Sequence, residues 1–463
     1  MYSLTFEKAV IWLLSAWAVA ALCAVFAGFT GFLLPFVSLL LIVPVSLSVA
    51  LVSWYLYSGS KDRTTYFLSL FLSFILLCNF VGTLVPEHGF DAVWYHLPVI
   101  SAVVTTHHFV YLPELYQSVN PQLSDVLLAL GYQVLGEFGT KFVAFSFVLT
   151  LIAVVGGALL QKIDRTWSLL ITSCIALFQV ITWQGGSAYI DVAKALWEVG
   201  AVYVLMLLEK PQQSMRTTLA LSILYATLCG MSIATKEFSL VLLPFFIILY
   251  WMTVRNWKRS AFVTLILLCV SAPFYIFSWL QTGSPITALQ QHTDRVSELT
   301  GFATWSEYLV NRTVTLPVAP VFASFLVRDY TSPLFFLIFY WFCVQFIQKK
   351  LSKTQSVVFL FVVLQLSIWW FLPPLSTRYA LSGFILGFVF SILHFVQTSR
   401  VQWQKHLLFV LLCSTALSMT LPRVLVAYRD MQYVLGYQTK EVYLSQFLDG
   451  NIDGPLKKWH GSR

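Results

Sequence analysis

Charged residues are scarce in this chain. Only 10% of its 463 residues are Asp, Glu, Lys or Arg, whereas 58% are hydrophobic and 16% are aromatic. Soluble globular domains usually contain about 25% charged residues, so this composition excludes a water-soluble protein. Because a backbone inside a lipid bilayer must satisfy its own hydrogen bonds, we expect an all-α polytopic membrane protein.

Two further kinds of pattern are missing. All seven cysteines fall within long apolar runs, so the polar loops have no cysteines from which to build a disulfide framework. The chain also has no array of basic and aromatic residues of the kind that binds nucleic acid, and its net charge of +8 comes mainly from short turns between apolar runs.

Apolar stretches long enough to cross a bilayer recur along the whole chain. A helix needs about 20 residues to span the hydrocarbon layer. We predict about thirteen transmembrane helices, near 10–29, 33–57, 65–85, 141–160, 168–184, 191–208, 217–234, 238–254, 260–280, 331–348, 355–374, 379–397 and 407–422.

The basic turns predict the orientation of these helices. If segment 121–136 lies along the membrane interface instead of crossing it, the short basic turns all fall on one side, which the positive-inside rule places in the cytoplasm. Two long loops, 86–140 and 281–330, then lie on the outer face together with a tail, 426–463. We therefore predict a membrane domain over 1–425 with interfacial helices in the first outer loop.

A cluster of acid, phenol and imidazole follows the third predicted span. Segment 90–98 reads FDAVWYHLP and opens the first outer loop. Other polar signatures lie on the same predicted face: YLPE at 111–114, NPQLSD at 120–125, YID at 189–191, TK at 235–236, GSP at 283–285, RY at 378–379, LGY at 435–437 and EVYL at 441–444.

The order and common sidedness of these segments resemble the GT-C superfamily of integral membrane glycosyltransferases, in particular bacterial relatives of protein O-mannosyltransferases. The resemblance covers roughly residues 65–450. It implies a GT-C-like helical bundle and transfer of a sugar from a polyprenyl-phosphate donor to an acceptor. The chain departs from the superfamily pattern in two ways: Asp91 has no adjacent acid, and no large soluble domain follows the last span.

Transfer of a sugar from a phosphate needs a base for the acceptor hydroxyl and cations for the departing phosphate. We expect Asp91 to be the base of an inverting reaction, although Asp is also a favoured cap for a helix beginning at Ala92. Lys236 and Arg378, each at the outer end of a span, are the candidate phosphate ligands. The alternative for both cations is that they extend to the lipid headgroups.

Further polar residues complete the predicted pocket: Glu87, Tyr95, His96, Glu114 and Asp191. The four histidines of the first outer loop, at 88, 96, 107 and 108, match no strong metal signature, so a divalent metal is an alternative that we do not favour. Lys194 and Glu198 share a helix stripe with Asp191 and are expected to form a structural bridge.

The predicted partners are a polyprenyl-phosphate sugar, membrane lipids and an acceptor that is a glycan, a lipid or a protein. The expected location is a bacterial inner membrane, with the site facing the periplasm or the exterior. A transporter or flippase of lipid-linked or small solutes is the alternative from another class, and an inactive scaffold is a third. Transporters commonly place polar groups at the bilayer midplane, whereas the spans here are nearly free of charge apart from Lys194 and Glu198.

Overall fold

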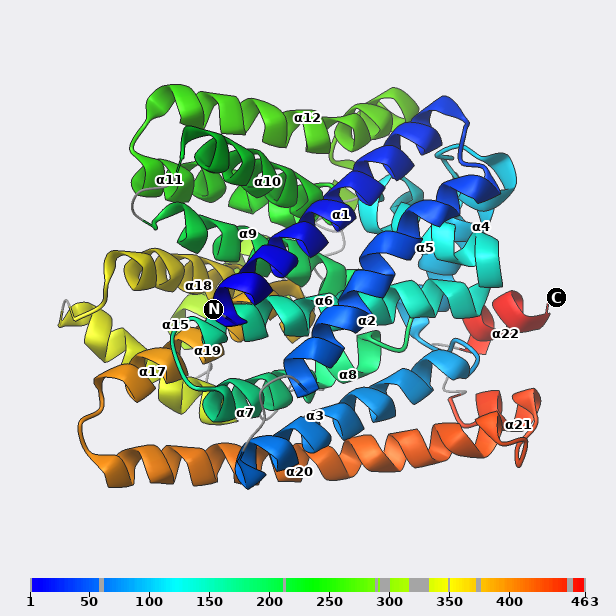
Figure 1. Ribbon diagram of the computed structural model, residues 1–463. Helices are drawn as coiled ribbons and strands as arrows, with labels where there is room; N and C mark the ends of the chain where they lie inside the picture. Colours follow the sequence, from blue (N-terminus) through cyan, green and yellow to red (C-terminus); the bar gives the residue numbers. More distant parts are fainter. Residues whose placement is uncertain are drawn as a thin grey trace.

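A computed structural model describes residues 2–57, 62–210, 214–287, 290–291, 300–315, 333–348, 350–371, 376–447 and 453–461. Every regular element within these residues is a helix. The long helices run side by side across the molecule in Figure 1, and the chain's N- and C-terminal ends lie at different ends of this bundle. The predicted all-α polytopic fold is therefore confirmed.

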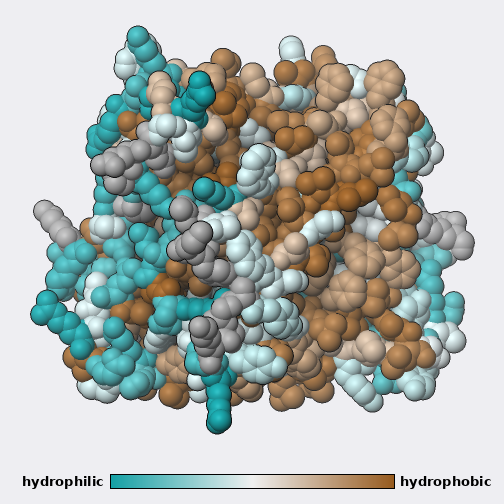
Figure 2. Space-filling model, viewed as in Figure 1, coloured by the Kyte–Doolittle hydropathy of each residue, from teal (hydrophilic) through white to brown (hydrophobic). Residues whose placement is uncertain are grey.

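Nine helices in the described part of the chain are long and apolar enough to cross a membrane. They coincide with nine of the predicted spans, and Figure 2 shows hydrophobic side chains gathered across the middle of this face between more hydrophilic edges. The helices are α1 (Tyr2–Thr30), η1 and α2 (Pro35–Leu41, Ile42–Tyr57), α3 (Arg63–Val81) with η2 (Gly82–Leu84), α6 (Glu137–Leu160), α10 (Met215–Ile233), η5 and α11 (Glu237–Leu242, Leu243–Val254), α12 (Trp257–Thr282), η6 and α19 (Thr377–Ala380, Leu381–Thr398) and α20 (Gln402–Val434).

The other four predicted spans correspond to helices that are shorter or that carry charge. Span 191–208 is α9 (Asp191–Leu208), and spans 331–348 and 355–374 are α17 (Pro333–Ile347) and α18 (Lys353–Phe371). Span 168–184 is not one helix: it divides into α7 (Arg165–Ala176) and α8 (Gln179–Gln184), because Phe178 adopts an extended ψ of 129°. The sequence prediction treated this mainly apolar stretch as one continuous span.

The first outer loop is folded into short helices. A π-helical turn, η3 (Ala92–His96), leads into α4 (Leu97–Thr106), and η4 (Tyr116–Val119) precedes α5 (Leu123–Leu135). Helix α5 is the segment predicted to lie at the interface; it packs against α6 and α4, with Leu123, Val126, Leu127 and Leu130 buried and Val134 exposed. The loop is therefore a packed cap on the bundle.

The C-terminal residues fold back onto this cap. Helix α20 continues beyond the predicted end of the last span to Val434, and α21 (Lys440–Ser445) and α22 (Asp453–Gly461) follow. These two helices lie at the same end of the bundle as α4 and α5, at the right of Figure 1. Trp459 Nε1 donates to Glu137 Oε2 at 3.1 Å, which attaches α22 to the start of α6. Of the second outer loop, the structure describes α15 (Trp305–Thr315) and short flanking pieces, and the rest of 281–330 lies outside the described residues.

Candidate functional site

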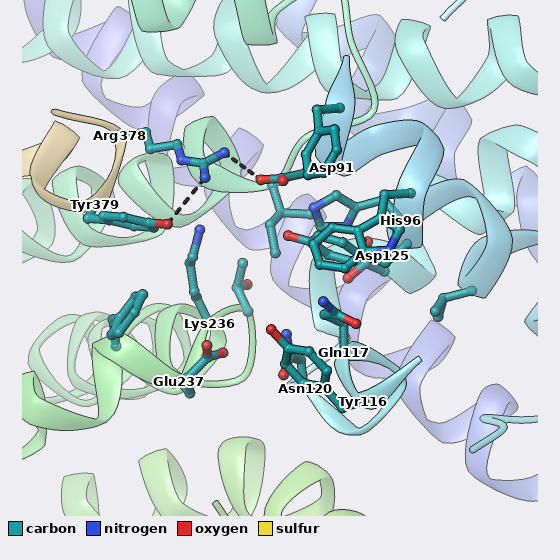
Figure 3. A pocket seen from close by; sticks show the side chains of 17 residues that line it. Asp91, His96, Tyr116, Gln117, Asn120, Asp125, Lys236, Glu237, Arg378 and Tyr379 are labelled. Carbon is teal, nitrogen blue, oxygen red and sulfur yellow. Dashed lines mark hydrogen bonds and ion pairs between the residues drawn. The ribbon is translucent and has the colours of Figure 1, made fainter. Parts of the chain in front are cut away.

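A cavity of about 370 Å³ opens where the first outer loop meets two other chain segments. One wall comes from η3, η4 and α5, and the opposite wall comes from residues 235–238 and from Arg378 and Tyr379 (Figure 3). Five of the eight predicted site residues line it: Asp91, Tyr95, His96, Lys236 and Arg378. The fold thus gathers residues that are up to 287 positions apart.

Asp91 and Arg378 face each other across the cavity. Arg378 Nη1 lies 2.6 Å from Asp91 Oδ2, and each side chain is 14% exposed. Arg378 Nη2 donates to the Tyr379 hydroxyl at 3.2 Å, and within the described structure its Nε has no hydrogen-bond partner. The guanidinium is therefore held through both Nη nitrogens, and its Nε–H remains available as a donor.

The backbone of Asp91 leaves its carboxylate free for this contact. Asp91 has helical angles, φ −62° and ψ −34°, and in the described structure its side chain makes no capping hydrogen bond, so the capping alternative is wrong. Its N–H instead donates to the Tyr189 hydroxyl at 3.1 Å. The π-helical turn that follows carries Tyr95 and His96; such turns inside helices are frequent at functional sites.

Lys236 is the second cation of the cavity. Its ammonium pairs with the Asp191 carboxylate and lies 4.6 Å from the centre of the Tyr379 ring. Burial is the largest single effect and lowers the pKa of Lys236, but the Asp191 charge, the Tyr379 phenol and the hydrogen bond to Asp191 together raise it, so the net direction is upward. Lys236 is therefore a protonated cation at neutral pH. The structure places Asp191 as the partner of Lys236, behind the cavity wall, where Gln184 Nε2 holds its other oxygen at 2.9 Å.

His96 and Asp125 form a buried pair at the floor of the cavity. His96 Nδ1 lies 2.7 Å from Asp125 Oδ1, and the Tyr95 and His96 rings are in contact at 4.1 Å between centroids. Burial, reinforced by the Asp91 charge, raises the pKa of Tyr95 well above its usual value, so Tyr95 stays a neutral phenol. Asp125 belongs to the NPQLSD segment but was not among the predicted site residues.

Glu87 and Glu114 are not among the described residues that line the cavity. Glu114 is exposed. Glu87 is fully buried and accepts hydrogen bonds from Gly89 N–H at 2.9 Å and from the Ser187 hydroxyl at 2.7 Å, and its Oε2 accepts from Ala188 N–H at 2.7 Å. Glu87 therefore attaches the start of the first outer loop to the chain that precedes Asp191.

The Lys194–Glu198 bridge expected within α9 is present, at 2.8 Å, and it is part of a larger network. Glu198 accepts hydrogen bonds from Ser232 and Ser239, which flank Lys236 in sequence, and from Ser382, which follows Arg378. Lys194 Nζ donates to the Tyr379 carbonyl at 3.3 Å. A single buried carboxylate thus connects both cation-bearing segments.

Two amide side chains that line the cavity, one in η4 and one at its C-terminal end, were not predicted from the sequence. Gln117 and Asn120 line the cavity, and among the described residues Gln117 Oε1 and Asn120 Oδ1 are buried without a hydrogen-bond partner. Figure 3 shows both on the side of the cavity away from Arg378, near Glu237 and Tyr116. Asn120 opens the NPQLSD segment but was not among the predicted site residues, and Gln117 had no signal beyond its closeness to that segment.

The histidines of the first outer loop do not converge. His88 stacks on Phe447 with centroids 3.8 Å apart, His96 pairs with Asp125, and His107 Nδ1 lies 2.9 Å from the Leu33 carbonyl oxygen. No group of three or more metal-ligating side chains comes together in the part of the chain that the structure describes. The loop histidines thus have three separate roles.

No protein-family model matches this sequence, and no curated protein matches it. Solved structures are similar to it in fold. ArnT from Cupriavidus metallidurans in the apo state superposes with a TM-score of 0.50 at 12% identity, over 87% of this chain and 78% of ArnT. The same protein bound to undecaprenyl phosphate gives 0.49 at 11% identity, over 86% and 78%. The oligosaccharyltransferase AglB from Archaeoglobus fulgidus, in complex with an inhibitory peptide and a dolichol-phosphate, gives 0.45 at 13% identity, over 79% and 56%. The chain therefore shares its overall polytopic helical fold with ArnT, as expected from the resemblance noted in the sequence.

Proposed function

We propose that this protein is an inverting glycosyltransferase that moves a sugar from a polyprenyl-phosphate donor to an acceptor hydroxyl at the outer face of the membrane. The observation that carries the proposal is the pairing of Asp91 with Arg378 inside a cavity that Lys236 also lines. A carboxylate and two cations are the groups that this reaction needs, and ArnT, whose fold is similar, has been crystallised with undecaprenyl phosphate.

Both cations have carboxylate partners in the structure, and this pairing predicts an order of events. A donor phosphate entering the cavity competes with Asp91 for the Arg378 guanidinium, which can bind phosphate oxygens through two parallel hydrogen bonds. Lys236, on the same wall of the cavity as Arg378, contributes a point charge. As Arg378 turns to the phosphate, the Asp91 carboxylate is released next to the reacting centre.

Asp91 then acts as the base. Its carboxylate takes the proton of the acceptor hydroxyl while that oxygen attacks the anomeric carbon from the face opposite the phosphate. The bond between the anomeric carbon and the phosphate oxygen breaks, and the polyprenyl phosphate leaves with the electron pair. Arg378 and Lys236 stabilise the charge that develops on the departing phosphate.

The amides opposite these charges are the proposed sugar contacts. Gln117 and Asn120 present buried oxygens that lack partners among the described residues, and sugar hydroxyls are hydrogen-bond donors. Glu237 and the Tyr95 phenol add an acceptor and a donor to the same cavity. The donor sugar therefore lies between the two amides and Asp91.

We place the protein in a bacterial inner membrane with this cavity on the periplasmic side. The basic turns between helices support the placement, because the first outer loop and the C-terminal helices lie at the end of the bundle away from the α11–α12 and α19–α20 turns (Figure 1). The acceptor is a glycan, a lipid or a protein at that surface.

A transfer assay on the purified protein in lipid tests the proposal. Radiolabelled polyprenyl-phosphate sugars are supplied as a panel with membrane extract as the acceptor, and Asp91→Asn is run beside the wild type. We expect transfer from one donor and its loss in Asp91→Asn, with donor binding retained. Full turnover by Asp91→Asn would refute the role of the base. Movement of intact donor across liposome membranes without cleavage would instead favour the transporter.

A further inference from the structure

A second cavity, of about 540 Å³, lies on another side of the first outer loop, between α3, α8 and α20. None of the described residues that line it also lines the first cavity. The Trp183 ring contacts Tyr189 at 4.7 Å between centroids, and Tyr189 in turn binds the backbone of Asp91. The two cavities are thus neighbours with separate walls.

The charge in this cavity is mainly positive and partly buried. Arg423 is only 8% exposed; its Nη2 donates to the Cys78 carbonyl, and within the described structure its Nε has no hydrogen-bond partner. Arg429 also lines the cavity and pairs with Asp430 at 2.9 Å. Burial lowers the pKa of His88, so at neutral pH this ring adds no charge. Two guanidinium groups therefore face one carboxylate.

The surrounding backbone leaves room for a ligand headgroup. The break between α7 and α8 puts Leu177 and Gln179 on the cavity wall, and Pro422 interrupts the hydrogen-bond ladder of α20 beside Arg423. Gly82 and Gly186 pack directly on each other, with a Cβ added at Gly186 only 2.9 Å from the Gly82 carbonyl carbon. Larger residues at this contact would separate α3 from the start of the α8–α9 connection.

Apolar groups continue from the charged end toward the lipid-facing surface. Met419 and Val426 line the cavity, and Leu417, Leu421 and Leu425 of the same helix are between 59% and 64% exposed. A buried guanidinium with an unused donor costs free energy unless an acceptor reaches it. A charged pocket that continues into an apolar surface is complementary to an anionic headgroup with a hydrocarbon chain.

We infer that this cavity binds the phosphate headgroup of a membrane phospholipid, held by Arg423 and Arg429, with its chains lying along α20. Arg423 donates through Nε, Arg429 approaches from the rim, and the indole of Trp183 and the amide of Gln179 contact the rest of the headgroup. This site is separate from the donor cavity and does not depend on the proposed transfer reaction.

Photocrosslinking tests this inference. The full-length protein is reconstituted with a phosphatidylglycerol that carries a diazirine near its headgroup, and the labelled peptides are mapped by mass spectrometry. We expect labelling at 418–426, and a decrease of about tenfold or more in Arg423→Gln, because hydrogen bonds to charged groups are worth more than neutral ones. Arg423→Lys should retain part of the labelling, because it keeps the charge.

A second variant guards against misfolding of Arg423→Gln. Ser418 is exposed and lines the cavity, whereas Leu407 is exposed near the other end of the same helix and does not line it. Ser418→Trp should block labelling, and Leu407→Trp should leave it unchanged. Diacylglycerol, which lacks the phosphate, should not compete, and neither should millimolar inorganic phosphate.

The inference is overturned if Ser418→Trp labels like Leu407→Trp, or if Arg423→Gln folds normally and labels like the wild type. Competition by diacylglycerol would mean that chains alone are recognised, and complete competition by inorganic phosphate would mean an anion site that does not need lipid. Either outcome also rejects a phospholipid site.

Discussion

The guanidinium of Arg378 lies 2.6 Å from the carboxylate of Asp91, although 287 residues separate the two in sequence. Asp91 is the proposed base and Arg378 is the proposed phosphate ligand, and in the structure the two side chains bind each other. A substrate phosphate therefore has to exchange partners with a carboxylate before the base can act.

Removal of the Arg378 charge should mainly weaken binding of the donor. We expect Arg378→Gln to raise the KM for the donor about 10- to 100-fold, because a charge-assisted hydrogen bond to phosphate is lost. Arg378→Lys should restore only part of the donor affinity, because a lysine cannot bind two phosphate oxygens at once. Steady-state kinetics with polyprenyl phosphate as a product inhibitor measures the effect of each variant. Arg255→Gln, an exposed site in the α11–α12 turn, is the control, and an unchanged KM in Arg378→Gln would contradict the assignment.

The two unpartnered amides should affect recognition of the sugar and leave recognition of the phosphate intact. We expect Gln117→Ala and Asn120→Ala each to lower kcat/KM by about tenfold, because each removes one acceptor for a sugar hydroxyl. Inhibition by polyprenyl phosphate without a sugar should stay as in the wild type. If that inhibition weakens in parallel with kcat/KM, the amides do not contact the sugar specifically.

Glu198 and Lys194 should be strongly coupled in stability. Glu198→Ala leaves the Lys194 ammonium buried at 2% exposure without its charge partner, a change that typically costs about 3–5 kcal/mol. Replacing both residues, as in Lys194→Met with Glu198→Leu, should cost much less than the sum of the single changes. Thermal unfolding in detergent for the complete double-mutant cycle measures this coupling, and additive effects would show that the two residues do not act as a pair.

The Lys236–Asp191 pair should stabilise the fold at neutral pH and lose this effect in alkali. The pKa of Lys236 is raised in the folded protein, so the stabilisation is complete below the usual lysine pKa of about 10.4 and disappears as pH rises through the higher folded value. Melting temperatures of the wild type and Asp191→Asn should therefore differ at pH 8 and converge as the pH rises through the raised pKa of folded Lys236. A constant difference across this range would argue against a contribution from Lys236.

The point where Gly131 of α5 meets Gly139 of α6 should not tolerate a side chain. A Cβ added at Gly139 would lie 1.9 Å from the Gly131 carbonyl oxygen, so Gly139→Ala must push the helices apart. Since α5 carries Asp125 into the cavity, we expect both a lower melting temperature and reduced transfer. Gly454→Ala, where a Cβ meets nothing within 4 Å, is the matched control, and normal stability of Gly139→Ala would mean that the helices approach less closely.

Hydropathy and charge in the sequence determined the class of protein, nine of its spans and five of its cavity residues. These features are local: twenty apolar residues in a row predict a span wherever they occur, and Asp91, Tyr95, His96, Lys236 and Arg378 were conspicuous because polar groups are rare in such a chain. The break at Phe178 was not predicted, because the stretch is mainly apolar on both sides of it and the single Gln179 that follows does not indicate a helix break.

Tertiary structure alone decided which charges are partners and which residues reach the cavity. Asp191 and Glu87 were predicted in the pocket, but the fold places Asp191 under Lys236 and uses Glu87 to hold the loop backbone. Gln117 lines the cavity without any strong sequence signal, and Asn120, from the NPQLSD segment, lines it without having been predicted as a site residue. The reason is physical: a buried charge or amide takes whichever partner the packing of distant helices brings within about 3 Å, and that distance is not encoded in neighbouring residues.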